Sequence, residues 1–420
     1  MKPKSKASDF PGTPLKHRAK IILKRLKEES DLYCQETTLH GLHYITSRKS
    51  TRLQSIIWLA LCTVGMAFCV YFINEQLMRY NNNRVTTNVG TTAYSIYDVP
   101  FPSVTICNIN VVYANNTDKI EKIIEGQIPK ADIADFFFNL STLVLNDNLY
   151  GSVGYKSYEK ITNLLEEAGY STDKIMKILA QPCDSLLLEC KWNDTVRDCS
   201  TIFRTIKTTY GFCCSFNYKG VADDDPSSMT NIYVTGVGST YGLEVTLNVA
   251  EDQYVSALKP YYGIQVAIHE AYQYPDLVMA SSTIFPGFKQ SYGLSPKIVS
   301  SNDELRVINS ENRGCLFYNE REMHWSGRYS FSSCINECRL RAIMTICECV
   351  PYYYPLENVT RFCTILDSKC LKSSAGYYSE FDEQTPERMT KSMRKCKCLP
   401  QCNEISYSYH TESHPSSEQM

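Results

Sequence analysis

Cysteine is the residue type in this sequence that is best suited to form a chemical site, because its residues are numerous and closely spaced. The chain of 420 residues has 19 cysteines, and ten of them lie between Cys315 and Cys402. The pairs in Cys347-Glu-Cys349 and Cys396-Lys-Cys398 could present thiolates to zinc, but zinc sites usually have wider gaps of about two to four residues. In an oxidising compartment such thiols pair instead. We therefore expect a disulfide-bonded segment here and no metal.

Catalytic patterns are absent from the sequence. It has seven histidines, scattered along the chain, and no His-Glu-x-x-His, Gly-x-Ser-x-Gly, phosphate-binding loop or dinucleotide-binding glycine pattern. His269-Glu270 follows a strand-like segment, and we interpret His269 as a hydrogen-bonded edge residue rather than a catalytic base. The sequence therefore predicts no enzyme, no cofactor and no nucleic-acid partner.

One apolar run is long enough to cross a membrane. Ile56–Ile73 contains 18 residues without a charge, which as a helix would span roughly 27 Å. Basic residues precede the run, and residues 1–54 hold twelve Lys/Arg against five Asp/Glu. By the positive-inside rule the N-terminus is cytosolic and the chain after the run is extracellular. Residues 1–30 are interpreted as a flexible tail with a basic amphipathic patch at Lys20–Lys27, either solvated or grazing the membrane.

The long segment after the apolar run has the marks of an extracellular domain. It contains sixteen of the cysteines, an even number that permits complete pairing as eight disulfides. Every Asn-x-Ser/Thr sequon also lies there, so we expect glycosylation at Asn115, Asn139, Asn193 and Asn358.

The extracellular segment mixes the two periodicities of secondary structure. Strand-like patterns occur at 99–112, 203–218, 231–249 and 262–269, and helix-like patterns at 131–145, 158–168 and 174–180. Asp223–Pro226 is expected to be a loop. Strands with helices inserted between them predict an α+β fold.

Helical spacing organises the cysteine-rich segment. Cys334 and Cys338 are four residues apart, so they share one face of a helix that Ser332 or Ser333 can cap. A second helix is expected to begin at Thr385-Pro386, to reach Lys395 and to lead into Cys396-x-Cys398. Disulfides could join the two helices like rungs, but the spacing alone leaves the pairing open.

Several motifs, in order, carry a family resemblance. They are Leu39-His40-Gly41 before the apolar run, Phe101-Pro-Ser-Val-Thr-Ile-Cys107-Asn108 after it, Gly211-Phe-Cys213-Cys214-Ser-Phe-Asn217, Gly242-Leu-Glu-Val-Thr-Leu247, Gly263–His269, and Cys334-x-x-x-Cys338 through Cys347-x-Cys349-x-Pro351. With these motifs the chain resembles the degenerin/epithelial sodium channel superfamily over residues 33–410, and it looks most like the pickpocket-type subunits of arthropods.

The resemblance implies a disulfide pairing and a division into domains. The implied pairs are Cys107–Cys213, Cys190–Cys199, Cys315–Cys402, Cys334–Cys398, Cys338–Cys396, Cys347–Cys370 and Cys349–Cys363, and Cys183–Cys214 is added by elimination. The implied divisions are a cytosolic N-terminus (1–54), a first transmembrane helix (55–74), an extracellular palm, finger, knuckle and β-ball (75–314), a cysteine-rich thumb (315–402) and the start of a return strand (403–420).

The resemblance also implies a function. Members form trimeric, amiloride-sensitive sodium channels of the plasma membrane, either as homo- or as hetero-trimers. Sodium ions, the lipid bilayer and an extracellular ligand are the implied partners. His40 and Gly41 would then be gating residues in the cytosolic segment.

One expected element has no counterpart in this sequence. No second apolar run follows Cys402, and the family's selectivity filter belongs to that second helix. We expect the sequence to be an incomplete channel subunit. The alternatives are a modulatory short isoform that assembles with full-length subunits, and a non-conducting single-span ectodomain that binds a ligand.

Overall fold

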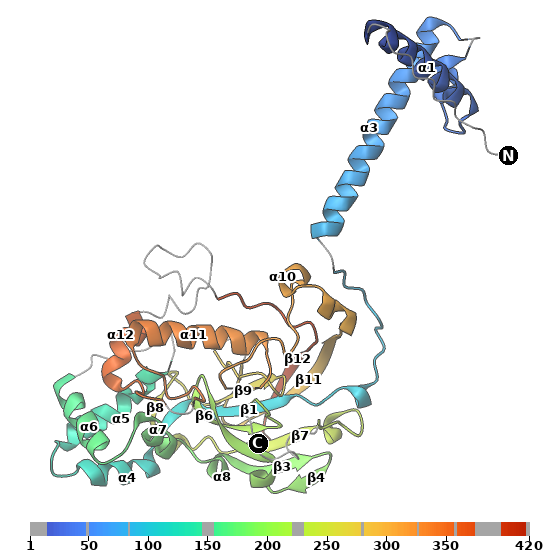
Figure 1. The fold of residues 1–420 in the computed structure, drawn as a ribbon. Helices are drawn as coiled ribbons and strands as arrows, with labels where there is room; N and C mark the ends of the chain where they lie inside the picture. Colours follow the sequence, from blue (N-terminus) through green and yellow to red (C-terminus); the bar gives the residue numbers. More distant parts are fainter. Residues whose placement is uncertain are drawn as a thin grey trace. The chain divides into compact units, whose positions relative to one another are not determined.

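The computed structural model describes residues 15–47, 50–82, 85–144, 155–220, 231–278, 281–325, 327–356, 359–373 and 396–416. The chain divides into two compact units, Met1–Asn88 (unit 1) and Val89–Met420 (unit 2), which are considered separately below. Figure 1 shows the elements of each unit along the chain.

Unit 1 consists of three helices. They are α1 (Leu15–Glu36), α2 (Leu42–Thr46) and α3 (Arg52–Asn82). Helix α1 contradicts the expectation of a flexible tail for residues 15–30, because a regular helix begins at Leu15, and residues 1–14 lie outside the described residues. The prediction of a flexible tail was based on the polar composition of this segment. Its apolar residues nevertheless recur at helical spacing, and that periodicity favours a helix.

Helix α3 is the candidate membrane span. Among the described residues it is the one helix long and apolar enough to cross a bilayer, over Arg52–Asn81, and its apolar side chains are exposed. The apolar run predicted from the sequence lies inside this helix, which continues past it to Asn82.

Unit 2 is built around an antiparallel sheet of five strands. The strand order is β10-β9-β1-β6-β5, and each neighbouring pair is antiparallel. The innermost strand, β1, is almost entirely buried, as expected for a strand with partners on both sides. The strands are β1 (Ser103–Asn108), β5 (Phe203–Thr208), β6 (Gly211–Phe216), β9 (Ile264–His269) and β10 (Ser282–Ile284).

Three smaller antiparallel sheets complete the strands of unit 2. They pair β2 (Asn110–Tyr113) with β8 (Tyr254–Ala257), β3 (Leu187–Trp192) with both β4 (Thr195–Arg197) and β7 (Leu243–Leu247), and β11 (Phe288–Val299) with β12 (Glu404–Pro415). The β11–β12 ladder is the longest, running from Phe288 opposite Pro415 to Val299 opposite Glu404.

Helices pack around these sheets, and Figure 1 shows α4–α7 gathered at one end of unit 2. The α-helices are α4 (Ala114–Ile124), α5 (Lys130–Asn139), α6 (Tyr155–Glu167), α7 (Thr172–Leu179), α8 (Cys183–Leu186), α9 (Cys199–Ile202), α10 (Ser310–Arg313), α11 (Phe331–Cys347) and α12 (Ser368–Ser373). Short 3₁₀ helices lie at Ile96–Asp98, Leu140–Leu143, Ser239–Tyr241, Glu251–Gln253, Asp303–Val307 and Ile365–Asp367. The mixed helix-and-sheet class expected from the sequence is confirmed.

The structure corrects some local expectations. The strand expected over 99–112 is two strands, β1 and β2, separated at Ile109. Helix α11 begins earlier than expected, because Ser330 rather than Ser332 or Ser333 is the cap and accepts a hydrogen bond from the Ser333 amide. Asp223–Pro226 and the helix expected from Thr385 to Lys395 lie outside the described residues.

Candidate functional site

Gly41 of the His-Gly motif lies at a tight packing point in unit 1. It caps the N-terminus of α2 with φ = 92°, a backbone conformation that favours glycine. A Cβ atom at Gly41 would lie 2.9 Å from the Sγ of Cys62 and 3.2 Å from the ring of Trp58, both on α3. The close approach of the turn to α3 therefore requires glycine. The neighbouring His40 is exposed.

A second contact holds the same turn against α3. The ring of Tyr44, on α2, stacks on the ring of Trp58 with centroids 4.8 Å apart and planes at 23°. Trp58 and Cys62 are four residues apart, so they share a face of α3. Together these contacts couple the position of the His-Gly turn to one face of the candidate membrane span.

Disulfides connect the elements of unit 2. The structure contains eight, and they are the same eight pairs that the resemblance implies. Five of them lie within the segment from Cys315 to Cys402, which we call the disulfide module. Cys34, Cys62 and Cys69, all in unit 1, are free thiols.

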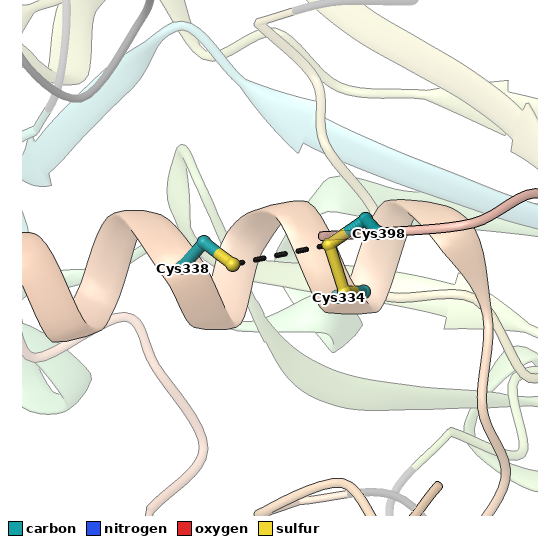
Figure 2. Close-up of side chains that lie close together, drawn as sticks. All are labelled: Cys334, Cys338 and Cys398. Carbon is teal, nitrogen blue, oxygen red and sulfur yellow. Dashed lines mark hydrogen bonds between the residues drawn. A yellow bond between two sulfur atoms is a disulfide. The ribbon is translucent and has the colours of Figure 1, made fainter. Parts of the chain in front are cut away.

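Cys334, Cys338 and Cys398 form the one group among the described residues with the side-chain types and spacing of a metal site. Their sulfur atoms lie within 4.8 Å of one another, and Figure 2 shows Cys398 reaching α11 from a neighbouring segment of chain. All three sulfurs are already in disulfides, with Cys334 bonded to Cys398 and Cys338 bonded to Cys396. Zinc binds cysteine as a thiolate, so the oxidised group does not fit a metal.

Polar contacts attach helix α11 of the disulfide module to the loop after β9. Arg339 donates to the Asp276 carboxylate, and the two side chains are 12% and 8% exposed. Asn336, also on α11, donates to the same carboxylate at 3.4 Å. At the start of the helix the Tyr274 amide donates to the Ser333 hydroxyl at 3.2 Å. Because the Asp276–Arg339 pair is mostly buried, removal of one partner would leave an uncompensated charge.

An aromatic cluster lies beside these contacts. The rings of Tyr274, Trp325 and Tyr354 are all buried, with centroids 5.7–5.9 Å apart. The Tyr274 hydroxyl donates to the Tyr353 carbonyl at 3.0 Å. Burial raises the pKa of Tyr274 and Tyr354 well above the usual value, so both phenols are neutral at physiological pH. The cluster extends the attachment of the disulfide module to the loop after β9.

Two neighbouring titratable residues lie where strand β9 ends, His269 as its last residue and Glu270 just after it. The Thr105 hydroxyl is 2.8 Å from Nε2 of His269, and Nδ1 of the same ring is 2.9 Å from the Glu270 carbonyl. Burial lowers the pKa of His269 to about 4. Burial also raises the pKa of the Glu270 carboxyl to about 6, opposed by a hydrogen bond from Gln401. The geometry agrees with a hydrogen-bonded, neutral His269.

The four sequons differ in accessibility. Asn115, at the start of α4, is exposed, and Asn193 is half-buried in the turn between β3 and β4. Asn139 is only 4% exposed, and its Nδ2 atom donates to the Tyr158 hydroxyl at 3.0 Å and to the Asp135 carbonyl at 2.8 Å. This corrects the expectation for Asn139, because a glycan would have to leave through that buried nitrogen. Asn358 lies outside the described residues.

Comparison with known proteins assigns the family. The family model described as amiloride-sensitive sodium channel matches residues 33–420 of the chain. The chain belongs to the amiloride-sensitive sodium channel family. The expectation from the sequence motifs, including the arthropod pickpocket type, is confirmed.

Individual channel proteins are similar over most of the chain. Sodium channel protein Nach of Drosophila melanogaster is 25% identical over 403 residues, which cover 91% of this chain and 72% of that protein. Pickpocket protein 28 of the same organism is 23% identical over 417 residues, covering 91% and 64%. Acid-sensing ion channel 1A of Danio rerio is 21% identical over 389 residues, covering 90% and 70%.

Sequence reasoning missed the contacts that place the family motifs. It named Gly41 but not its neighbours Trp58 and Cys62, although their spacing of four residues in the apolar run was a usable signal. It also missed the Asp276–Arg339 pair. The two residues are 63 positions apart, so no local pattern joins them.

Proposed function

We propose that this chain is a subunit of a sodium channel in the plasma membrane, gated from its extracellular part. The observation that carries the proposal is the family match, which runs without interruption through the His-Gly turn, α3, the central sheet and the disulfide module. Sodium is the permeant ion that the family description and the Nach relatives name. The subunit assembles as a trimer with itself or with related subunits.

The proposed orientation follows from charge and from the redox state of the cysteines. Unit 1 up to α3 is cytosolic, in agreement with its excess of Lys and Arg and with its free thiol at Cys34. Unit 2 is extracellular, which agrees with its eight disulfides and with an exposed sequon at Asn115. The two sides of the membrane thus hold chemically different parts of one subunit.

In the proposed mechanism, the disulfide module is the thumb of the channel and acts as a stiff lever. Five disulfides restrict its internal motion. A force applied to α11 therefore moves the module as a whole instead of deforming it. The Asp276–Arg339 pair and the aromatic cluster attach this lever to strand β9 of the proposed palm sheet. Strand β1 pairs with β9, so a displacement of the lever is passed to the centre of this sheet.

The His-Gly turn is the proposed cytosolic end of this path. Gly41 lets the turn approach Trp58 and Cys62 closely, so a rotation of α3 would displace the turn. His40 is exposed and free to hydrogen-bond to a neighbouring subunit at the inner mouth of a pore. In this proposal the motif transmits the movement of α3 to the conducting path.

The test is co-expression of the chain with pickpocket-type subunits in oocytes. We expect surface complexes that contain both chains, recovered by biotinylation and co-purification, and an amiloride-sensitive sodium current that differs from that of the partner alone. A chain that reaches the surface and forms no complex with any related subunit or with itself would contradict the proposal. So would a complex whose sodium current is insensitive to the presence of this chain.

A further inference from the structure

Helix α1 presents an apolar face that no other described element covers. Ile22, Leu23 and Leu26 are 58%, 64% and 61% exposed. Ile22, Leu26 and Tyr33 are spaced at intervals of four and seven residues, so they share one face of the helix. Such a stripe is typical of a helix that packs against an apolar surface.

The charges of α1 are divided along its length. All six of its Lys and Arg residues lie between positions 16 and 27, and all four of its Asp and Glu residues lie between positions 28 and 36. Lys20, Lys24 and Lys27 follow one another at helical spacing on the side of the helix away from the apolar face, and together they form a cationic face. The N-terminal half is therefore both cationic and amphipathic.

This order of charges is unfavourable for a helix alone in water. A helix macrodipole is positive at its N-terminus, where α1 has its cations, and negative at its C-terminus, where α1 has its carboxylates. The ion pair that α1 does form, Lys24 with Glu28 at 4.0 Å, is exposed and has the less favourable order of lysine before glutamate. An external anion near the N-terminal half of the helix would therefore stabilise it.

We propose that α1 is an interfacial helix that binds an anionic phospholipid surface. Its apolar face would enter the boundary between headgroups and acyl chains, while its lysines contact the acidic headgroups. A lipid surface is favoured over an acidic protein because only 15 residues, 37–51, separate α1 from the candidate membrane span α3. That tether holds α1 near the bilayer at a high effective concentration. The inference rests on the membrane span and not on ion conduction.

Hydrogen exchange of the full chain in lipid nanodiscs tests the proposal. The two lipid compositions are phosphatidylcholine alone and phosphatidylcholine with phosphatidylserine at about 7:3. We expect the α1 amides to exchange at least about tenfold more slowly in the anionic discs, and this difference to shrink at about 1 M salt. The α2 amides report whether unit 1 remains folded.

Three variants separate charge, apolar contact and general perturbation. Lys20→Gln/Lys24→Gln/Lys27→Gln removes the cationic face and should abolish the difference between the lipids, since each lysine contributes roughly fivefold to binding. Ile22→Ser/Leu26→Ser removes the apolar contact and should weaken protection in the anionic discs. Ile21→Ser/Leu32→Ser is the matched control, because these residues are similarly exposed (47% and 51%) but lie off the apolar face, and it should retain protection.

Two results would overturn the proposal. One is equal exchange of the α1 amides in both lipid compositions with α2 protected. The other is exchange that slows only when an acidic helix-binding protein such as calcium-loaded calmodulin is added, which would assign α1 to a protein partner. Neither result depends on whether the chain carries current, so failure of this inference is distinct from failure of the proposed channel function.

Discussion

Arg339 and Asp276 form a mostly buried ion pair between helix α11 and the loop that follows β9. The pair joins the disulfide module to the central sheet without a covalent bond. All five disulfides of the module, by contrast, join residues within it. The attachment of the module to the sheet is therefore more sensitive to point substitution than the module itself.

Replacement of Arg339 tests this attachment. Arg339→Met leaves the Asp276 carboxylate buried without its partner, and we expect the free energy of unfolding of the purified chain to fall by about 3–5 kcal/mol. The double variant Arg339→Met/Asp276→Leu should recover most of that loss, because no charge is then left uncompensated. Lys289→Ala is the control, since its pair with Glu244 is exposed (69% and 51%) and should contribute no more than about 1 kcal/mol. Equal losses for Arg339→Met and Lys289→Ala in urea unfolding would contradict the prediction.

Substitution of Gly41 tests the packing of the His-Gly turn on α3. Gly41→Ala costs about 1–2 kcal/mol for the left-handed backbone and places a methyl group against the Cys62 thiol. We expect the turn to move away from α3, and Cys62 to react faster with a maleimide in chains whose Cys34 and Cys69 are replaced by Ser. Gly65→Ala, on α3 with open space around it, is the matched control and should leave the labelling rate unchanged. Unchanged labelling in Gly41→Ala would show that the close contact is not formed.

Two sequons provide a test of burial in unit 2. Asn115→Gln should remove one glycan, seen as a loss of one glycosidase-sensitive step on a gel, and should leave stability unchanged because Asn115 is exposed. Asn139→Gln should remove no glycan. It should destabilise the chain by about 1–3 kcal/mol, since it disturbs the hydrogen bonds of a buried amide to Asp135 and Tyr158. A glycan on Asn139 in the folded protein would contradict the structure.

The pKa shifts of His269 and Glu270 predict opposite effects on stability. The folded state holds the pKa of His269 at about 4, below its usual 6.5, so the unfolded state binds more protons and stability falls as the pH drops from about 6.5 to 4. The folded state raises the pKa of Glu270 from 4.5 to about 6, so the contribution of Glu270 is present below about pH 4.5 and is lost as the pH rises through 6. Between pH 4.5 and 6 the two effects partly cancel.

Single substitutions at these positions should separate the two effects. Between pH 7 and pH 5 we expect Glu270→Gln to lose about 1 kcal/mol more stability than the unsubstituted chain, and His269→Gln to lose about 2 kcal/mol less. The measurement is the free energy of unfolding at each pH, with each variant compared with its own value at pH 7. If both variants followed the pH curve of the unsubstituted chain, neither group would carry the assigned shift.

The sequence by itself determined the features that depend on short stretches of chain. The candidate span follows from one apolar run, and α6 and α7 follow from apolar residues at helical spacing, because these signals are complete within one element. The ordered motifs were sufficient for the family, since each of them is a local pattern. Where polar composition was weighed above apolar spacing, as in the N-terminal segment that forms α1, the prediction was wrong.

Only the tertiary structure decided which distant residues meet. Asp276 lies 63 positions before Arg339, and nothing near either residue indicates that its charge is paired. The sequon at Asn139 looks like the one at Asn115, yet the packing of α5 against α6 buries only Asn139. Gly41 requires glycine because the chain returns to place Trp58 and Cys62 beside it. Burial and close contact depend on the folded arrangement of separate elements, and that arrangement is not encoded in the spacing within any one of them.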